Sequence, residues 1–325
     1  MSALRPVLLA AAAVLALAVP WLAPGGYALH LAIMAALYAA LALSLNLLLG
    51  YAGQLSLGHV AYFGLGAYAA ALANLELGAP IWAGLAAGGA LAAAAGLVIG
   101  GLAFKVRGAY FVILTVSFAE VIRLIALNWM DVTQGPLGLP GITPFGSKTS
   151  AWFAALALAA ASLVACHRIV RSRTGRALVA LRENEPLARS IGIDVYRHLV
   201  VASALSAGMA GVAGGIYAHH QAFMSPEVFS FGYTVTMVIM VVAGGQGTLA
   251  GPVLGAILFT LLPEWLRAAQ EWRLVVYAVI LLAVVVFMPK GIVPTAAAWL
   301  GRRRPAGPAA APNAAPPAAA AEPRQ

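Results

Sequence analysis

Long apolar runs organise the chain, and short glycine-rich or charged segments separate them. A membrane-spanning helix needs about 20 mostly apolar residues, and these runs are continuous rather than alternating with the period of a strand. The pattern predicts an all-α fold, a polytopic transmembrane helical bundle of about ten spans. The expected spans are Pro6–Leu22, Ala28–Leu49, Val60–Leu75, Ile81–Phe104, Ala109–Trp129, Ala151–Cys166, Leu199–His219, Gly232–Ala243, Pro252–Leu266 and Leu274–Met288.

The composition supports a membrane setting. Hydrophobic residues make up 62% of the chain and charged residues only 9%, whereas a soluble domain is about 25% charged. So few charges cannot cover a soluble particle of 325 residues. The single cysteine, Cys166, also excludes an internal disulfide and a cysteine-based metal cluster.

The net charge of +9 predicts an orientation in the membrane rather than a nucleic-acid partner. The basic residues lie in short clusters between apolar runs, and aromatic residues are not interleaved with them. Cytoplasmic loops of membrane proteins carry an excess of Lys and Arg. The clusters after the fourth, sixth and last spans are therefore expected inside, which puts both termini in the cytoplasm and Asp131–Ser150 outside.

The two ends of the chain carry little information about function. The first apolar run could be a cleaved signal peptide, although its cleavage-site pattern is weak and we expect it to be retained as a span. We expect residues 1–300 to form one transmembrane domain. Residues 301–325 form an Ala/Pro-rich tail that is expected to be disordered.

Two similar glycine-rich segments stand out, at Gly50–Tyr68 and Ala243–Ala256. The pentapeptide GQLSL that begins at Gly53 corresponds to GQGTL at Gly245, and each precedes a helix rich in small residues. Paired glycine-interrupted segments mark transport sites built from broken helices. The alternative is two tight turns beside closely packed helices. The span count places both segments on the same side of the membrane.

The expected fifth span contains polar groups at Thr115, Ser117, Glu120 and Arg123. An ionisable residue within a span is costly, so it is a candidate functional residue. Glu120 and Arg123 are three positions apart and can pair on one helix face. The pair could fix helix packing, or it could take part in substrate passage.

Two features belong to the expected outer side. The segment Asp131–Ile142 is rich in Gly and Pro and fits either a docking surface for an external partner or a simple connector. His219 and His220 are adjacent and cannot share a helix face, which makes a metal site there unfavourable.

The segment 171–198 is long and charged in a chain that has few charges. Its pattern predicts a short amphipathic helix, a break at Pro186, another helical turn and a stop at Gly192. The helix could lie on the membrane surface, or it could dock into a groove of a partner protein.

Four blocks of this sequence resemble the permeases of branched-chain amino-acid ABC importers. They are LSLNLLLGYAGQLSLGHVAYFGLGAY, GAYFVILTVSFAEVIRLIALNW, GRALVALRENEPLARSIGID and VVAGGQGTLAGPVLGA. They occur in order, and the resemblance extends from Leu41 to Pro289 and is strongest to the M-type permease of that family. It implies a multi-pass protein of the bacterial inner membrane that has no cofactor of its own.

The resemblance also implies partners and site residues. The partners are a homologous H-type permease, two ABC ATPase subunits, a periplasmic substrate-binding protein and the transported small molecule. The family's ATPase-docking motif corresponds to Gly175, Arg176, Ala177, Arg182, Glu183, Asn184 and Gly192. The translocation pathway corresponds to Gly53, Gln54, Ser56, Gly245, Gln246 and Thr248, to which the residues of the fifth span add Thr115 and Glu120.

ATP hydrolysis is assigned to the partners, because no phosphate-binding loop is present. The nearest match, GITPFGSKT at 141–149, has an extra residue, Ser147, before its lysine and lies on the expected outer side. We expect no catalytic residue, since no cluster of carboxylates or histidines suits an enzyme. Three functions remain open: import of branched-chain amino acids, import of urea or another small amide or acid, and proton-coupled transport through Glu120.

Overall fold

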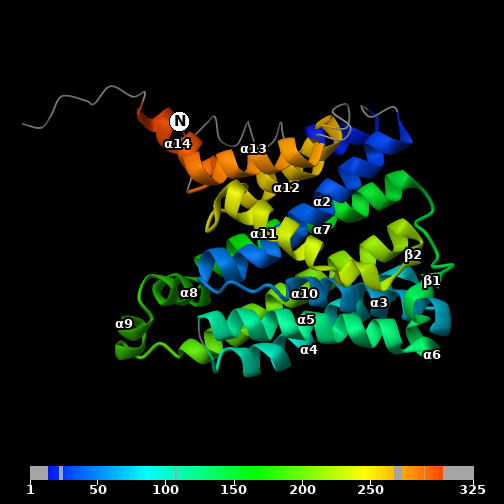
Figure 1. Ribbon diagram of the computed structural model, residues 1–325, viewed down its shortest axis with the longest axis horizontal. Helices are drawn as coiled ribbons and strands as arrows, with labels where there is room; N and C mark the ends of the chain where they lie inside the picture. Colours follow the sequence, from blue (N-terminus) through cyan, green and yellow to red (C-terminus); the bar gives the residue numbers. More distant parts are fainter. Residues whose placement is uncertain (1–13, 22–24, 107, 267–272, 289, 303–325) are drawn as a thin grey trace, which may run out of the picture.

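A computed structural model describes residues 14–21, 25–106, 108–266, 273–288 and 290–302 (Figure 1). The helices are α2 (Gly26–Asn46), α3 (His59–Leu77), α4 (Ile81–Ala103), α5 (Ala109–Asn128), α6 (Met130–Thr133), α7 (Lys148–Arg171), α8 (Arg173–Glu183), α9 (Glu185–Ser190), α10 (Val195–Gln221), α11 (Phe231–Gly245), α12 (Ala250–Trp265), α13 (Arg273–Phe287) and α14 (Ile292–Arg302). A π-helix, η1 (Leu47–Tyr51), continues α2, and two 3-10 helices are η2 (Gly135–Leu137) and η3 (Pro226–Phe229).

Within the described residues, six helices are long and apolar enough to cross a membrane: α2 with its π-helical continuation, α3, α4, α5, α7 and α10. They match six of the expected spans, so the polytopic helical fold is confirmed. The apolar helices α11 and α12 have 15 and 16 residues. At 1.5 Å per residue each is shorter than the ~30 Å hydrocarbon layer. The count of about ten spans therefore stays a prediction.

Parts of the ends lie outside the described residues. Of the expected first span, only residues 14–21 are described, and they are helical. The expected tail lies outside the described residues from position 303 onward.

Close helix packing through glycine joins α3, α4 and α10. A Cβ on Gly66 would lie 2.1 Å from the carbonyl oxygen of Gly211, and a Cβ on Gly88 would lie 2.5 Å from the carbonyl oxygen of Gly66. Small residues let helix backbones approach in a membrane, where lipid is as apolar as the side chains. The many small residues of these runs thus allow the three helices to pack closely. Helix α2 packs against α7 and α12.

The molecule has two distinct ends along its longest axis (Figure 1). The short helices α8 and α9 lie at one end. At the other end, strand β1 (Leu139–Pro140) pairs antiparallel with β2 (Phe223–Met224), with Leu139 opposite Met224. The segment Asp131–Ile142 was expected to be a loop, but it contains part of α6, η2 and β1. Strand β1 forms because the segment after α10 supplies its backbone partner, β2.

Candidate functional site

The two glycine-rich segments meet at the end of the molecule that carries α8. The first loop, residues 52–58, follows η1, and the second, residues 246–249, joins α11 to α12. Asn46 connects them: its Nδ2 donates to the carbonyl of Thr248 at 2.8 Å, and its Oδ1 accepts from the backbone N–H of Gly247 at 2.9 Å. Both loops therefore lie at one end of the molecule.

Glycine is required by the shapes of both loops. Gly53 has φ +70° and Gly247 has φ +73°, a left-handed conformation that side chains disfavour. Thr248 ties the second loop to the first turn of α12, because its Oγ1 donates to the carbonyl of Gly245 and accepts from the N–H of Gly251. The π-helical turn η1 before the first loop is of a kind that is frequent at functional sites.

Helix α8 lies against both loops through Arg182. The Nη1 of Arg182 donates to the carbonyl of Gly50 at 2.6 Å. A Cβ on Gly53 would be 2.7 Å from the Cγ of Arg182, and one on Gly247 would be 2.7 Å from its Nη1. The glycines therefore leave the space that this side chain occupies. Beside it, Leu178 and Leu181 are buried in one cluster with Leu47 and Leu48 of η1.

The remaining docking residues divide between inner and outer positions. Gly175 and Ala177 are buried, and a Cβ on Gly175 would clash with the Ile169 carbonyl at 2.2 Å. Four others are exposed: Arg176, Glu183, Asn184 and Gly192. Arg176 donates to the Arg171 carbonyl, and Glu183 pairs with Arg182 at 2.8 Å. Asn184 caps α9 by accepting from the Leu187 N–H, and Gly192 has φ +84°.

Two exposed apolar residues of this segment were not predicted as site residues from the sequence. Leu187 lies within α9 and is 60% exposed, and Ile191, which directly follows α9 four positions later, is 69% exposed. They lie in a charged segment outside the apolar runs, and an apolar pair at helical spacing there was the signal that could have identified them.

Thr115 belongs to the loop site, whereas Glu120 does not. The Oγ1 of Thr115 accepts from the backbone N–H of Leu57 at 3.3 Å and is buried, so it anchors α5 to the first loop. Arg123 donates three hydrogen bonds to Glu120, from Nε to Oε1 at 3.1 Å, from Nε to Oε2 at 2.9 Å and from Nη2 to Oε1 at 2.5 Å. The pair is half exposed, at 50% for Glu120 and 31% for Arg123.

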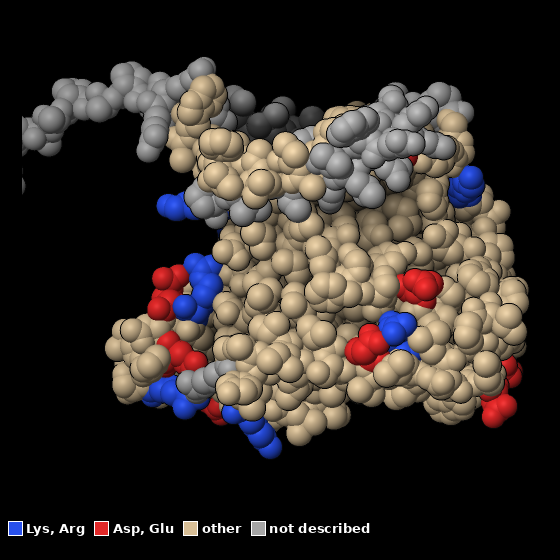
Figure 2. All heavy atoms as spheres, viewed as in Figure 1, with Lys and Arg blue, Asp and Glu red and all other residues tan. Residues whose placement is uncertain are grey.

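The loop residues assigned to the pathway differ in exposure. Ser56 is buried, Gln54 and Thr248 are partly buried, and Gln246 is exposed. The Glu120–Arg123 pair lies apart from them, and η3 packs against the same helix, α5. Figure 2 shows a small group of acidic and basic side chains over α5 and η3, set apart from the larger charged group at the α8–α9 end.

The adjacent histidines point to different partners. The Nε2 of His220 lies 2.8 Å from the Nδ1 of His30. The Nδ1 of His219 lies 2.8 Å from the carbonyl oxygen of Thr143. Within the part of the chain that the structure describes, no group of three His, Cys, Asp or Glu side chains could hold a metal ion.

Comparison with known proteins identifies the family. Residues 27–285 match the family described as "Branched-chain amino acid transport system / permease component". The chain is similar to the high-affinity branched-chain amino acid transport system permease protein LivM of Escherichia coli, at 33% identity over 88% of this chain and 74% of that protein. LivM of Salmonella typhimurium is 32% identical over 86% of this chain and 73% of its own length.

A relative with another stated substrate is also found. The ribose import permease protein RbsC of Escherichia coli is 28% identical over 68% of this chain and 72% of its own length. No solved structure gave a significant match. The helices able to cross a membrane, the family match over most of the chain and the LivM similarity agree. This chain is therefore a multi-pass inner-membrane protein that belongs to the permease components of branched-chain amino acid transport systems.

Proposed function

We propose that this chain is the M-type half of a permease pair that carries branched-chain amino acids into the cell when partner ATPases hydrolyse ATP. The similarity to LivM over most of both chains supports this substrate class. The ribose import permease is a more distant relative, and urea or another small amide or acid remains the alternative substrate.

The observation that carries the proposal is the contact of α8 with both glycine-rich loops. A permease driven by an external ATPase needs a segment that the ATPase can hold and that is tied to the pathway. In this chain α9 offers the exposed apolar residues Leu187 and Ile191 for a groove of the ATPase. The guanidinium of Arg182 connects the same segment to Gly50.

The proposed mechanism is alternating access. Closure of the ATPase pair moves α8 and α9 as one lever, and Arg182 transmits the displacement to the loops at 52–58 and 246–249. A partner shifts such an equilibrium only by its different affinity for the two states. The ATPase must therefore bind the outward-facing and inward-facing states with different strength.

The proposed topology puts the α8 end in the cytoplasm and the β1–β2 end in the periplasm, with about ten spans and both termini cytoplasmic. The segment 131–150 then offers a surface to the periplasmic binding protein. The Glu120–Arg123 pair is partly exposed on one face of α5, at 50% for Glu120 and 31% for Arg123. Charges facing lipid are costly, so this face is assigned to the H-type permease and the pathway between the two subunits.

Two substitutions in the complete importer test the docking assignment. Exchange of Gly192 for a bulky residue strains a left-handed position, since nothing lies within 4 Å of its missing Cβ and the cost is conformational. Reversal of charge at Glu183 removes the exposed partner of Arg182. Both variants are expected to hydrolyse ATP without matching leucine uptake. Normal uptake by both would exclude the assignment.

A further inference from the structure

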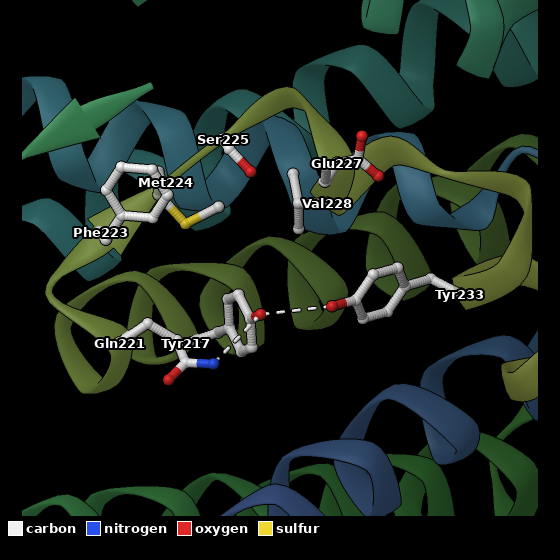
Figure 3. A pocket seen from close by; sticks show the side chains of 8 residues that line it. All are labelled: Tyr217, Gln221, Phe223, Met224, Ser225, Glu227, Val228 and Tyr233. Atoms are coloured by element: carbon white, nitrogen blue, oxygen red, sulfur yellow. Dashed lines mark hydrogen bonds between the residues drawn. The ribbon is translucent and has the colours of Figure 1, made fainter. Parts of the chain in front are cut away.

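A separate cavity of about 280 Å³ lies near the β1–β2 end, opposite the end that carries α8 and the glycine-rich loops. The end of α10, the segment from β2 to η3 and the first turn of α11 enclose it (Figure 3). Pockets for drug-sized ligands are typically 300–1,000 Å³, so this volume suits a smaller molecule.

Hydrogen-bonding groups gather on one side of the cavity. The hydroxyls of Tyr217 and Tyr233 point toward each other from facing elements at 3.3 Å, and the Nε2 of Gln221 donates to the Tyr217 hydroxyl, also at 3.3 Å (Figure 3). The bond between the hydroxyls is longer than the usual 2.7–2.8 Å, and the bond from the amide nitrogen is longer than the usual 2.9–3.0 Å, so both are weak. A ligand carboxylate can replace them and receive stronger, charge-assisted bonds from the same groups.

A carboxylate lies on another side of the cavity. Glu227 is exposed, and its carboxylate interacts electrostatically with Arg123 of α5 without a hydrogen bond. Figure 3 shows its carboxylate directed away from the two tyrosine hydroxyls. Donors and a negative charge are therefore separated across the cavity, as a ligand with a carboxylate and an ammonium group requires.

Apolar side chains complete the lining. Phe223, Met224 and Val228 come from the same segment as Glu227. Apolar walls with a few well-placed polar groups are typical of small-molecule sites, where the polar groups set orientation. An aliphatic side chain can contact these three residues while the charged end of the molecule faces the polar groups.

We propose that this cavity is an outer acceptance site for a zwitterionic α-amino acid with an aliphatic side chain. Glu227 receives the ammonium, and Tyr217, Tyr233 and Gln221 donate to the carboxylate. The inference rests on the proposed import of branched-chain amino acids and adds a position at which the substrate binds. Neither the sequence nor the relatives assign these residues.

The test is substrate protection of a cysteine in the cavity. Ser225→Cys is placed in the complete importer in proteoliposomes, and its reaction with a membrane-impermeant maleimide is followed on the isolated permease band. The native Cys166 is buried and serves as the unreactive background. Millimolar leucine is expected to slow labelling at least threefold. 4-Methylpentanoate, which has the leucine skeleton without the ammonium, is expected not to.

Matched variants link the protection to Glu227. Glu227→Gln is expected to remove the advantage of leucine over 4-methylpentanoate, while Glu76→Gln, an exposed carboxylate of α3 outside the cavity, keeps it. Should Ser225→Cys fail to assemble, Phe223→Cys gives a second position in the same lining. Equal labelling with and without leucine would overturn the site.

Uptake of radioactive leucine in the same vesicles separates the two proposals. Vesicles that import leucine but give no protection overturn the cavity site and leave the importer function standing. Vesicles that import no leucine in the presence of ATP and binding protein overturn the proposed function, whatever the labelling result.

Discussion

The guanidinium of Arg182 donates a hydrogen bond to the backbone carbonyl of Gly50 at 2.6 Å, across 132 positions of sequence. The bond joins the helix expected to face the ATPase to the end of the π-helix before the first glycine-rich loop. Arg182 therefore points toward the body of the protein. The surface left for a partner lies farther along, at Leu187 and Ile191.

Removal of this guanidinium is expected to uncouple the importer. A hydrogen bond to a charged group contributes about 1.5–3 kcal/mol, which is roughly a tenfold or larger change in an equilibrium. Arg182→Ala should lower leucine uptake at least tenfold while ATP hydrolysis by the assembled complex continues. Arg197→Ala, an exposed arginine at the start of α10, is the control and should change neither rate much. Unchanged uptake in Arg182→Ala would contradict transmission through this bond.

The exposed apolar pair of α9 gives a prediction about assembly. Full burial of a Leu or Ile side chain contributes about 1.5–3 kcal/mol, and a carboxylate in an apolar groove is costly. Leu187→Asp and Ile191→Asp should each weaken co-purification of the ATPase at least tenfold. Leu77→Asp changes a leucine at the end of α3 that is even more exposed, at 80%, and should co-purify the ATPase normally. Normal recovery with both α9 variants would place the docking surface elsewhere.

Asn46 is expected to hold the two loops together. Asn46→Leu keeps the approximate size of the side chain but leaves the N–H of Gly247 and the carbonyl of Thr248 without their partner. An unsatisfied group costs about 1–3 kcal/mol when it is buried, and these two groups are partly buried. The melting temperature of the purified permease should therefore fall by several degrees. Asn128→Leu loses one exposed bond to the Leu124 carbonyl and should melt near the wild-type temperature.

Continuous apolar runs predicted the long helices well because length and hydrophobicity alone decide whether a segment can cross a membrane. The runs at Ile81 and Ala109 begin at the same residues as α4 and α5. The short strand β1 could not be predicted in this way, since its pairing with β2 depends on residues more than 80 positions away.

The site was predicted in part. Repetition of the GQ pattern identified both glycine-rich loops, but it carried no information about what joins them. Asn46 was overlooked inside an apolar run, although a buried amide in such a run needs partners. The sequence also left open which face of α8 turns inward, and this depends on the tertiary position of η1. The cavity beside Glu227 is formed by segments whose register no local pattern reveals.

The last prediction concerns the ion pair of α5 and separates an ATP-driven importer from a proton-coupled carrier. Glu120→Gln leaves Arg123 without its partner in a spanning helix, where an arginine costs about 2.5–3.5 kcal/mol near the centre. We expect the single variant to reduce the amount of assembled permease pair and, with it, uptake.

Exchange of the two charges isolates the cause. In the double variant Glu120→Arg, Arg123→Glu the residues remain three positions apart and can pair again, so assembly and ATP-dependent uptake should recover to within about threefold of wild type. The measurement is leucine uptake by vesicles with and without the ATPase subunits. A carrier that uses Glu120 as its titrating group predicts uptake without ATPases and no recovery, because the carboxylate has moved to another position. Those two results together would replace the importer with a proton-coupled transporter.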